Sequence, residues 1–175
     1  VTSGQRDVVL GELAALSAGQ ADSVIQTLNT EIDALRRMTE DSAVQAEIKT
    51  AGASITPANR DVTFHPNARL QQLITTHRIT RPQLDAVAVL DMQGYVLASA
   101  PMYTSTALPP NGSWEWFRAA RDAEVDAVYV SGPIDDGLTG QRGVHIAVPI
   151  YDELVPGRFI GMTYAVWNMD NLPAL

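Results

Sequence analysis

The segment from Leu84 to Asp170 constrains the fold of this chain more than any other part of the sequence. Short runs rich in Val, Ile, Ala and Tyr recur along it, separated by turn residues or by one short helical stretch. Such runs are typical of β-strands, in which successive side chains point to opposite faces of a sheet. The sequence predicts five strands, around 86–90 and at 95–98, 125–131, 143–151 and 158–167.

Two turns and one helix connect these predicted strands. The letters DMQG at 91–94 join the first two strands into a hairpin, and DELVPG at 152–157 joins the last two. A loop rich in Pro, Thr and Ser occupies 100–113. Ser113 is a suitable N-cap for a helix over 114–122, because its hydroxyl can accept a hydrogen bond from an N–H group of the first turn.

Residues 5–39 carry an amphipathic helical pattern. Apolar side chains recur every three or four residues, as in Ile25, Leu28, Ile32 and Leu35, and therefore share one face of the helix. Such a helix would be about 50 Å long at about 1.5 Å per residue, which exceeds the diameter of a small domain. Packing on the sheet explains its C-terminal half. Its N-terminal half could project and pair with a second copy of the chain.

The sequence predicts that this helix ends near residue 42, where Ser42 and Gln45 resemble a capping box. A shorter helix follows and is expected to stop at Gly52, because glycine is common just after helix ends. Pro66 suits the first turn of a third helix. His77 falls on the apolar side of that helix, where we interpret it as a core histidine that is satisfied by its neighbours.

The composition is that of a globular protein of one domain. The chain has 175 residues, of which 46% are hydrophobic and 18% charged, so it can bury a substantial core. Its net charge of −8 would repel phosphate backbones and anionic lipid headgroups, which argues against nucleic-acid binding. Disulfides and thiolate chemistry are excluded, since the sequence has no cysteine. No apolar run approaches the roughly 18 residues of a membrane span, and we expect the chain to be a segment of a longer protein.

The sequence carries no recognisable catalytic constellation. Its three histidines, His65, His77 and His145, are far apart and lack metal-ligand spacing. No Gly-x-Ser-x-Gly elbow is present, and the glycine-rich letters at 137–143 have neither dinucleotide nor P-loop spacing. We interpret the acidic pair at 135–136 as part of a solvated loop. We therefore expect no catalytic residue, no bound metal and no cofactor.

The order of these pieces is similar to that of the Cache family, the extracytoplasmic PAS-like sensor domains of bacterial receptors. The resemblance covers residues 84–170, about half of the chain, and the long preceding helix fits the same family. It rests on five stretches in the family's order: AVLDMQGYVLAS, close to a strand–Asp–x–x–Gly–strand hairpin; WFRAA, close to a Trp–Phe helix start; VYVSGPI; TGQRGVHIAVPIYD, close to a Thr–Gly and strand–Pro pattern; and FIGMTYAV, close to the closing strand.

The resemblance implies an α+β fold, a PAS-like five-stranded antiparallel sheet with the long N-terminal helix on one face. It implies one extracytoplasmic sensor domain over 1–175, with two helices in 1–52 and the sheet core in 66–170. A pocket on the other face would be roofed by the loop and helix at 100–124. Family members bind small molecules there and pass the signal across a membrane to a kinase, a chemoreceptor or a cyclase module.

Two departures from the family pattern bear on the ligand. In the amino-acid-binding members, an Arg two residues before the Trp of the Trp–Phe pair holds the ligand carboxylate, and an Asp in the last strand holds the amine. This chain has Trp114 at the first position and Val166 at the second. A pocket lined by Trp114, Trp116 and Tyr129 suits a less polar or cationic ligand instead, because aromatic faces attract protonated amines.

The alternation along two strands divides their side chains between the two faces of the sheet. The set predicted to pack on the long helix is Val128, Val130, Val144, Ile146 and Val148. The set predicted to face the pocket is Tyr129, Ser131 and His145. With the roof, the predicted ligand-binding residues are Tyr103, Trp114, Trp116, Phe117, Tyr129, Ser131 and His145. Each also has a structural interpretation, as a core aromatic or as a polar side chain satisfied by backbone groups.

The leading hypothesis is a ligand-sensing domain in the periplasmic or extracellular part of a bacterial membrane receptor, tethered to the membrane by segments outside this chain. Ligand binding would shift the sheet against the long helix. One alternative is an interaction module with a vestigial pocket, which would form homodimers through residues 5–35. A second alternative is a small cytosolic enzyme with a PAS-like sheet.

Overall fold

The computed structural model describes residues 18–62, 64–102, 115–135 and 142–168. Within these ranges the chain forms both helices and strands. In chain order they are α2 (Ala18–Glu40), α3 (Ser42–Ala53), α4 (Ala68–Ile79), β1 (Leu84–Asp91), β2 (Val96–Ala100), α5 (Glu115–Asp122), β3 (Tyr129–Asp135), β4 (Arg142–Tyr151) and β5 (Phe159–Asn168).

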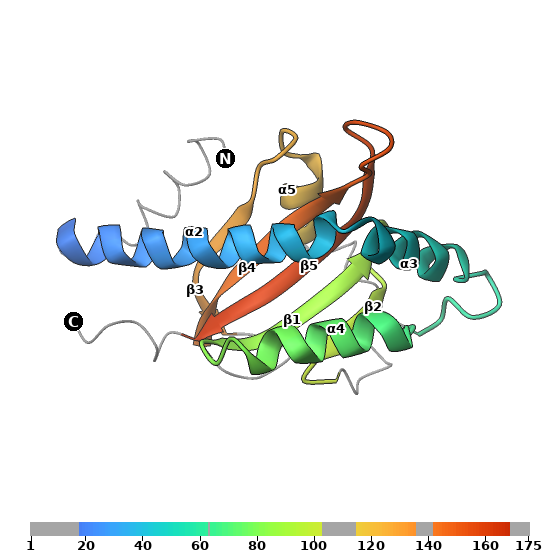
Figure 1. Cartoon of the computed structure of the whole chain (residues 1–175), viewed down its shortest axis with the longest axis horizontal. Helices are drawn as coiled ribbons and strands as arrows, with labels where there is room; N and C mark the ends of the chain where they lie inside the picture. The colour runs from blue at the N-terminus through green and yellow to red at the C-terminus, as the bar shows by residue number, and fades with distance from the viewer. Residues whose placement is uncertain (1–17, 63, 103–114, 136–141, 169–175) are drawn as a thin grey trace.

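The strands form one antiparallel sheet with the order β2-β1-β5-β4-β3. The last strand, β5, lies in the centre of the sheet between β1 and β4 (Figure 1). In this position Ala165 lies opposite Val87 of β1 and opposite Ile146 of β4. The five-stranded antiparallel sheet predicted from the sequence is therefore confirmed.

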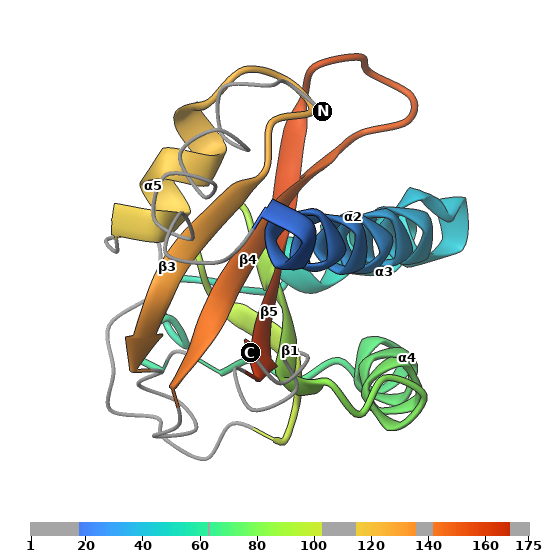
Figure 2. The same ribbon diagram turned by 90° about the vertical axis from the view of Figure 1, so that its left-hand side faces the viewer.

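Helices α2, α3 and α4 cover one face of the sheet, and α5 lies on the opposite face (Figure 2). The core beneath the three helices includes Leu35 of α2, Ile48 of α3 and Ile74 of α4, all fully buried. They pack with sheet residues such as Val87 and Ile146. Burial of each such side chain contributes about 1.5–3 kcal/mol relative to exposure, so the helical layer is held mainly by apolar contact.

The predicted division of side chains between the two faces is observed. The core beneath the three helices contains Val128, Val144, Ile146 and Val148, with Val130 partly buried against it. Tyr129 packs against the opposite cluster, which includes Trp116, Phe117 and Tyr164. The alternation of side chains along a strand thus assigned these residues correctly, because both faces of the sheet are covered.

The break between α2 and α3 lies where the sequence predicts it, but the cap residue differs. Asp41, not Ser42, is the N-cap of α3, and its carboxylate accepts hydrogen bonds from two N–H groups of the first turn, at 2.8 and 3.2 Å. A charged acceptor at a helix N-terminus is also favoured by the helix dipole. Gln45 takes no part in a capping box, because its buried amide donates to the Tyr151 carbonyl oxygen in β4 at 2.9 Å.

Three other predicted boundaries are wrong by a few residues. Helix α3 continues one residue past Gly52, which keeps a negative φ. Helix α4 begins two residues after Pro66, with Asn67 as its N-cap. Strand β3 begins at Tyr129 rather than four residues earlier, because Asp126 has a φ of 71° and belongs to the loop before it.

The hairpin between β1 and β2 turns on Asp91. Its Oδ1 atom accepts hydrogen bonds from the N–H groups of Gln93 and Tyr95, both at 2.9 Å. Gly94 has a φ of 93°, which glycine adopts without strain. The turn predicted at 91–94 is therefore confirmed, and it holds the Asp91 carboxylate at the end of the sheet.

Candidate functional site

The sheet face beneath α5 contains most of the described residues that the sequence predicted as ligand contacts. Helix α5 is amphipathic and buries Trp116, Phe117 and Ala120, which lie on one side of the helix because of their spacing. Glu115 and Arg118 remain exposed on the other side. This packing holds the two aromatic rings against the sheet, as part of one cluster with side chains of β4 and β5.

A histidine and a tyrosine form a buried pair at the centre of this face. The Tyr164 hydroxyl and the His145 Nδ1 atom share a hydrogen bond of 2.8 Å, and the two rings meet edge to face at 5.2 Å. Tyr164 lies opposite Ala147, whose small side chain leaves room for the tyrosine ring to reach diagonally toward His145. Trp116 covers Tyr164 with a centroid distance of 4.6 Å. The face therefore combines an aromatic stack with one polar pair.

Ser131 has a structural role at the edge of this face. The pairing of β3 with β4 shifts between Val130 and Pro133, so β3 carries one extra residue there. The Ser131 hydroxyl accepts a hydrogen bond from the His145 N–H at 2.9 Å and so supplies an acceptor for that group. Ser131 is buried, and this bond fixes its side chain against β4.

Three positions that bear on the predicted ligand site remain, and the structure describes one of them. Tyr103 and Trp114 lie outside the residues that the structure describes. Val166 is fully buried, lies opposite His145 and belongs to the cluster beneath α5. At the position where the resemblance to the Cache family would place an Asp, this face presents an aliphatic side chain. The described side chains of this face are aromatic and apolar with few polar groups, and they are buried against one another.

The histidines lie on separate elements, and the described residues contain no group of three His, Asp or Glu side chains that could hold a metal ion. His77 on α4 is half-buried, and its Nε2 atom has no hydrogen-bond partner in the described part of the chain. Burial, assisted by the nearby Arg81 charge, lowers the pKa of His77 from 6.5 to about 4. The prediction that His77 is satisfied by its neighbours is therefore wrong for this atom. His65 contacts the Val62 carbonyl oxygen at 2.9 Å.

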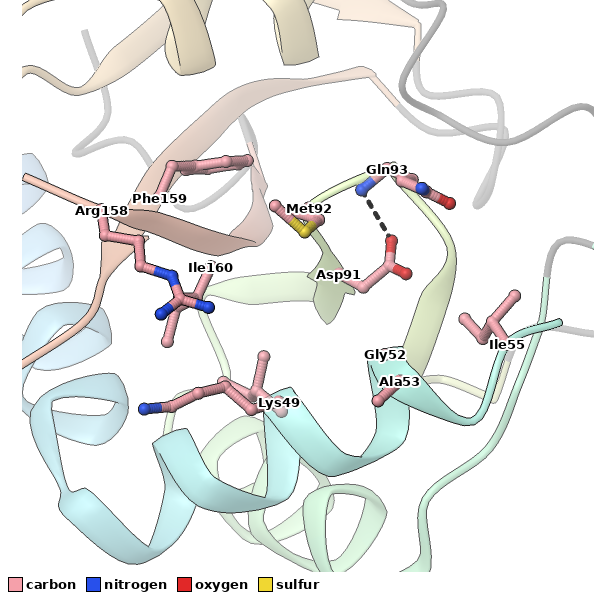
Figure 3. A pocket seen from close by; sticks show the side chains of 11 residues that line it. Lys49, Gly52, Ala53, Ile55, Asp91, Met92, Gln93, Arg158, Phe159 and Ile160 are labelled. Carbon is pink, nitrogen blue, oxygen red and sulfur yellow. Dashed lines mark hydrogen bonds between the residues drawn. The ribbon is translucent and has the colours of Figure 1, made fainter. Parts of the chain in front are cut away.

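A separate pocket of about 280 Å³ lies at the end of the sheet (Figure 3). Helix α3, the turn between β1 and β2, and the start of β5 form its walls. The sequence reasoning missed this pocket, because its lining residues come from three segments that are far apart in the chain. The one local signal was Gly52, a glycine within a stretch that is otherwise helical.

No protein-family model and no curated protein matches the chain, but solved structures do. The ligand-binding domain of the Pseudomonas fluorescens chemoreceptor CtaA, in complex with L-serine, is 16% identical, with a TM-score of 0.59 over 95% of this chain and 62% of that one. The E. coli DcuS sensor domain is 16% identical, with a TM-score of 0.57 over 84% of this chain and 92% of that one. The V. cholerae histidine kinase DctB sensor domain is 14% identical, with a TM-score of 0.60 over 94% and 58%.

The chain has the fold of these sensor domains. The likeness confirms the PAS-like architecture that the resemblance to the Cache family predicted. At identities of 14–16% it establishes the fold and leaves the ligand open. The chain spans about three fifths of the length of the CtaA and DctB domains, at 62% and 58%.

Proposed function

We propose that this chain is a ligand-sensing domain of a bacterial membrane receptor of the histidine kinase, chemoreceptor or cyclase type. The observation that carries the proposal is the aromatic face beneath α5, on a fold shared with sensor domains of such receptors. The domain would lie outside the cytoplasm as a single unit, and membrane segments would lie outside this chain. None of the described helices is long and apolar enough to cross a bilayer. Sensing requires no catalytic residue and no cofactor.

The face beneath α5 favours a cationic or weakly polar small molecule. Trp116 and Tyr164 offer aromatic surface, which attracts protonated amines at about 6 Å or less from the ring. Val166 supplies no carboxylate for an α-amino group. The residues proposed to contact the ligand are Tyr103, Trp114, Trp116, Phe117, Tyr129, Ser131 and His145.

A contact around the edge of the sheet offers a route from this face to α2. The Arg36 guanidinium on α2 donates a hydrogen bond to the backbone carbonyl of Asp126, in the loop between α5 and β3. Helices α2 and α5 lie on opposite faces of the sheet (Figure 2). A shift of α5 on ligand binding would therefore move the loop that Arg36 holds. In the proposed receptor, α2 would carry this displacement as a change between two packings.

Pairing of two copies through residues 5–35 stays a prediction. The outer side of α2, as far as its side chains are described, is polar, with Gln26, Thr30, Asp33 and Arg37 exposed. A polar helix face gives little hydrophobic stabilisation to a dimer. These residues therefore supply no observation that favours the interaction-module alternative over the sensor.

A ligand screen tests the sensor proposal. The purified chain is screened by thermal shift against small amines, amino acids and carboxylates, and compounds that raise the Tm are measured by calorimetry. Tyr129→Ala and Val130→Ala are a matched pair, because these neighbours on β3 are both half-buried and face opposite sides of the sheet. We expect Tyr129→Ala to weaken binding about tenfold or more and Val130→Ala to leave it unchanged.

Two results would contradict this proposal. One is a broad screen in which no compound raises the melting temperature of the chain. The other is an equal loss of affinity in both variants, which would place the ligand elsewhere or show that the loss comes from weakened folding.

A further inference from the structure

The pocket at the end of the sheet contains a buried carboxylate with one engaged oxygen and one unengaged oxygen. Asp91 is 3% exposed, and its Oδ1 atom accepts the two backbone hydrogen bonds of the β1–β2 turn. Its Oδ2 atom receives no hydrogen bond from the residues that the structure describes. Burial raises the pKa of the Asp91 carboxyl, and the backbone donors partly offset this effect. With no donor among the described residues, Oδ2 can accept a hydrogen bond from a ligand in the pocket.

Gly52 keeps Oδ2 of Asp91 accessible. A Cβ atom at Gly52 would lie 3.4 Å from the Asp91 Cβ and 3.8 Å from its Oδ2, which is ordinary van der Waals contact. Gly52 also has a negative φ, so neither its backbone nor its neighbours exclude alanine. Alanine would stabilise the helix by up to about 1 kcal/mol. Because glycine has no side chain, the space beside the Asp91 carboxylate stays open.

The two basic side chains of this pocket, Lys49 and Arg158, both lie within ion-pairing distance of Asp152. Lys49 Nζ lies 3.0 Å from Asp152 Oδ1, and Arg158 Nη1 lies 3.8 Å from Asp152 Oδ2. The Lys49 ammonium points away from Asp91 (Figure 3). Asp91 therefore remains as the carboxylate without a cationic partner within ion-pairing distance, in a chain with a net charge of −8. Both features favour a positively charged occupant.

Apolar side chains form most of the remaining wall. Ile48 and Ile55 line the side of α3 and its following loop, and Phe159 and Ile160 line the side of β5. Such walls suit a short alkyl group. A volume of about 280 Å³ limits the occupant to a small molecule.

We propose that this pocket binds a small primary ammonium ion, which donates a hydrogen bond to Asp91 Oδ2 and places its alkyl group against Phe159 and Ile55. The pocket borders the face beneath α5, because its Phe159 packs against Phe117 there, with ring centroids 6.2 Å apart. The proposal does not depend on the sensor function. Ligand at this position would contact α3, the β1–β2 turn and β5 at once, and would therefore join three separate segments of the chain.

Titration with ethylammonium chloride tests the proposal. Backbone amide signals of Gly52 and Gln93 are followed by two-dimensional NMR on the full chain, with potassium chloride at the same concentration as the ionic control. We expect saturable shifts with ethylammonium only. Gly52→Ala should weaken this binding at least tenfold, because the new methyl group lies against Oδ2, while the melting temperature stays equal or rises.

Thr50→Ala is the control, since it also introduces alanine into α3 but at an exposed position that does not line the pocket. It should leave ethylammonium binding unchanged. Asp91→Asn is a second variant, because its amide oxygen can still accept the turn hydrogen bonds while an NH₂ group replaces Oδ2. We expect it to abolish binding.

Three results would overturn the proposal: the same shifts with potassium chloride, no saturable shifts at all, or wild-type affinity in folded Gly52→Ala or Asp91→Asn. Tyr129→Ala distinguishes the two sites, because it should leave the ethylammonium shifts at Gly52 intact. Loss of those shifts in Tyr129→Ala would place the ammonium ion beneath α5 and would also overturn the proposal.

Discussion

Replacing Arg81 with Met tests whether the ion pair between Arg81 and Glu31 stabilises the packing of α2 on the core. Glu31 lies on α2, and its side chain is 2% exposed. Its Oε1 atom accepts a hydrogen bond from Arg81 Nη1 at 2.9 Å and another from the side-chain amide of Gln83. Its Oε2 atom has no hydrogen-bond partner in the described part of the chain. The Arg81→Met variant keeps an apolar stem of similar length but leaves the buried carboxylate without a counter-charge.

The expected cost follows from the burial of the two partners. Removing one member of a fully buried ion pair costs about 3–5 kcal/mol, because an uncompensated charge remains in the interior. The Arg81 side chain is 27% exposed, so water screens part of the interaction, and Gln83 still donates to Glu31. We therefore expect Arg81→Met to lower the free energy of unfolding by about 2–3 kcal/mol. This corresponds to a fall in Tm of about 4–12 °C.

Urea denaturation followed by circular dichroism measures this loss, with Glu31→Gln and the double variant completing a double-mutant cycle. Glu31→Gln should cost less, about 1 kcal/mol, because the charge that remains, on Arg81, is 27% exposed to water and its guanidinium can still donate to the Gln oxygen. The double variant should be more stable than Arg81→Met alone, because it leaves no unpaired charge buried. A double variant that is no more stable than Arg81→Met would refute the argument that an unpaired buried charge causes the loss.

Two further predictions concern stability. Burial lowers the pKa of His77 from 6.5 to about 4, so between these pH values the unfolded chain protonates His77 and the folded chain does not. The contribution of His77 to the free energy of unfolding should therefore be complete above about pH 6.5 and be lost as the pH falls toward 4. His77→Phe should flatten this part of the stability curve in urea titrations, and a slope that persists would contradict the assignment. Gly161→Ala should cost more than about 3 kcal/mol, because its Cβ would lie 2.5 Å from the Leu90 carbonyl oxygen. Gly157→Ala, in open space with a φ of 77°, should cost only about 1 kcal/mol in the same thermal melts.

Local patterns in the sequence predicted the strands, the hairpin turn and the distribution of side chains between the two faces. Val144 and Ile146 face the helices and His145 faces α5 because neighbouring strand residues must point to opposite sides. The hairpin was predictable because the residues that form its turn are close in the sequence: Asp91 accepts a hydrogen bond from the Tyr95 N–H, and Gly94 adopts the positive φ. The start of β3 was not, since apolar residues continue before Tyr129 although Asp126 breaks the strand by its backbone conformation.

Contacts between distant segments were decided only by the tertiary structure. The Gln45 side chain, predicted to form part of a helix cap, donates instead to a carbonyl oxygen in β4 that is 106 residues away. The Arg36 side chain donates to a loop carbonyl oxygen that is 90 residues away. The pocket beside Gly52 exists because the β1–β2 turn folds back against α3. Periodicity reports only which side of its own element a residue occupies. Which buried polar groups meet depends on how the elements pack, and that packing created both the His145–Tyr164 pair and the unengaged oxygen of Asp91.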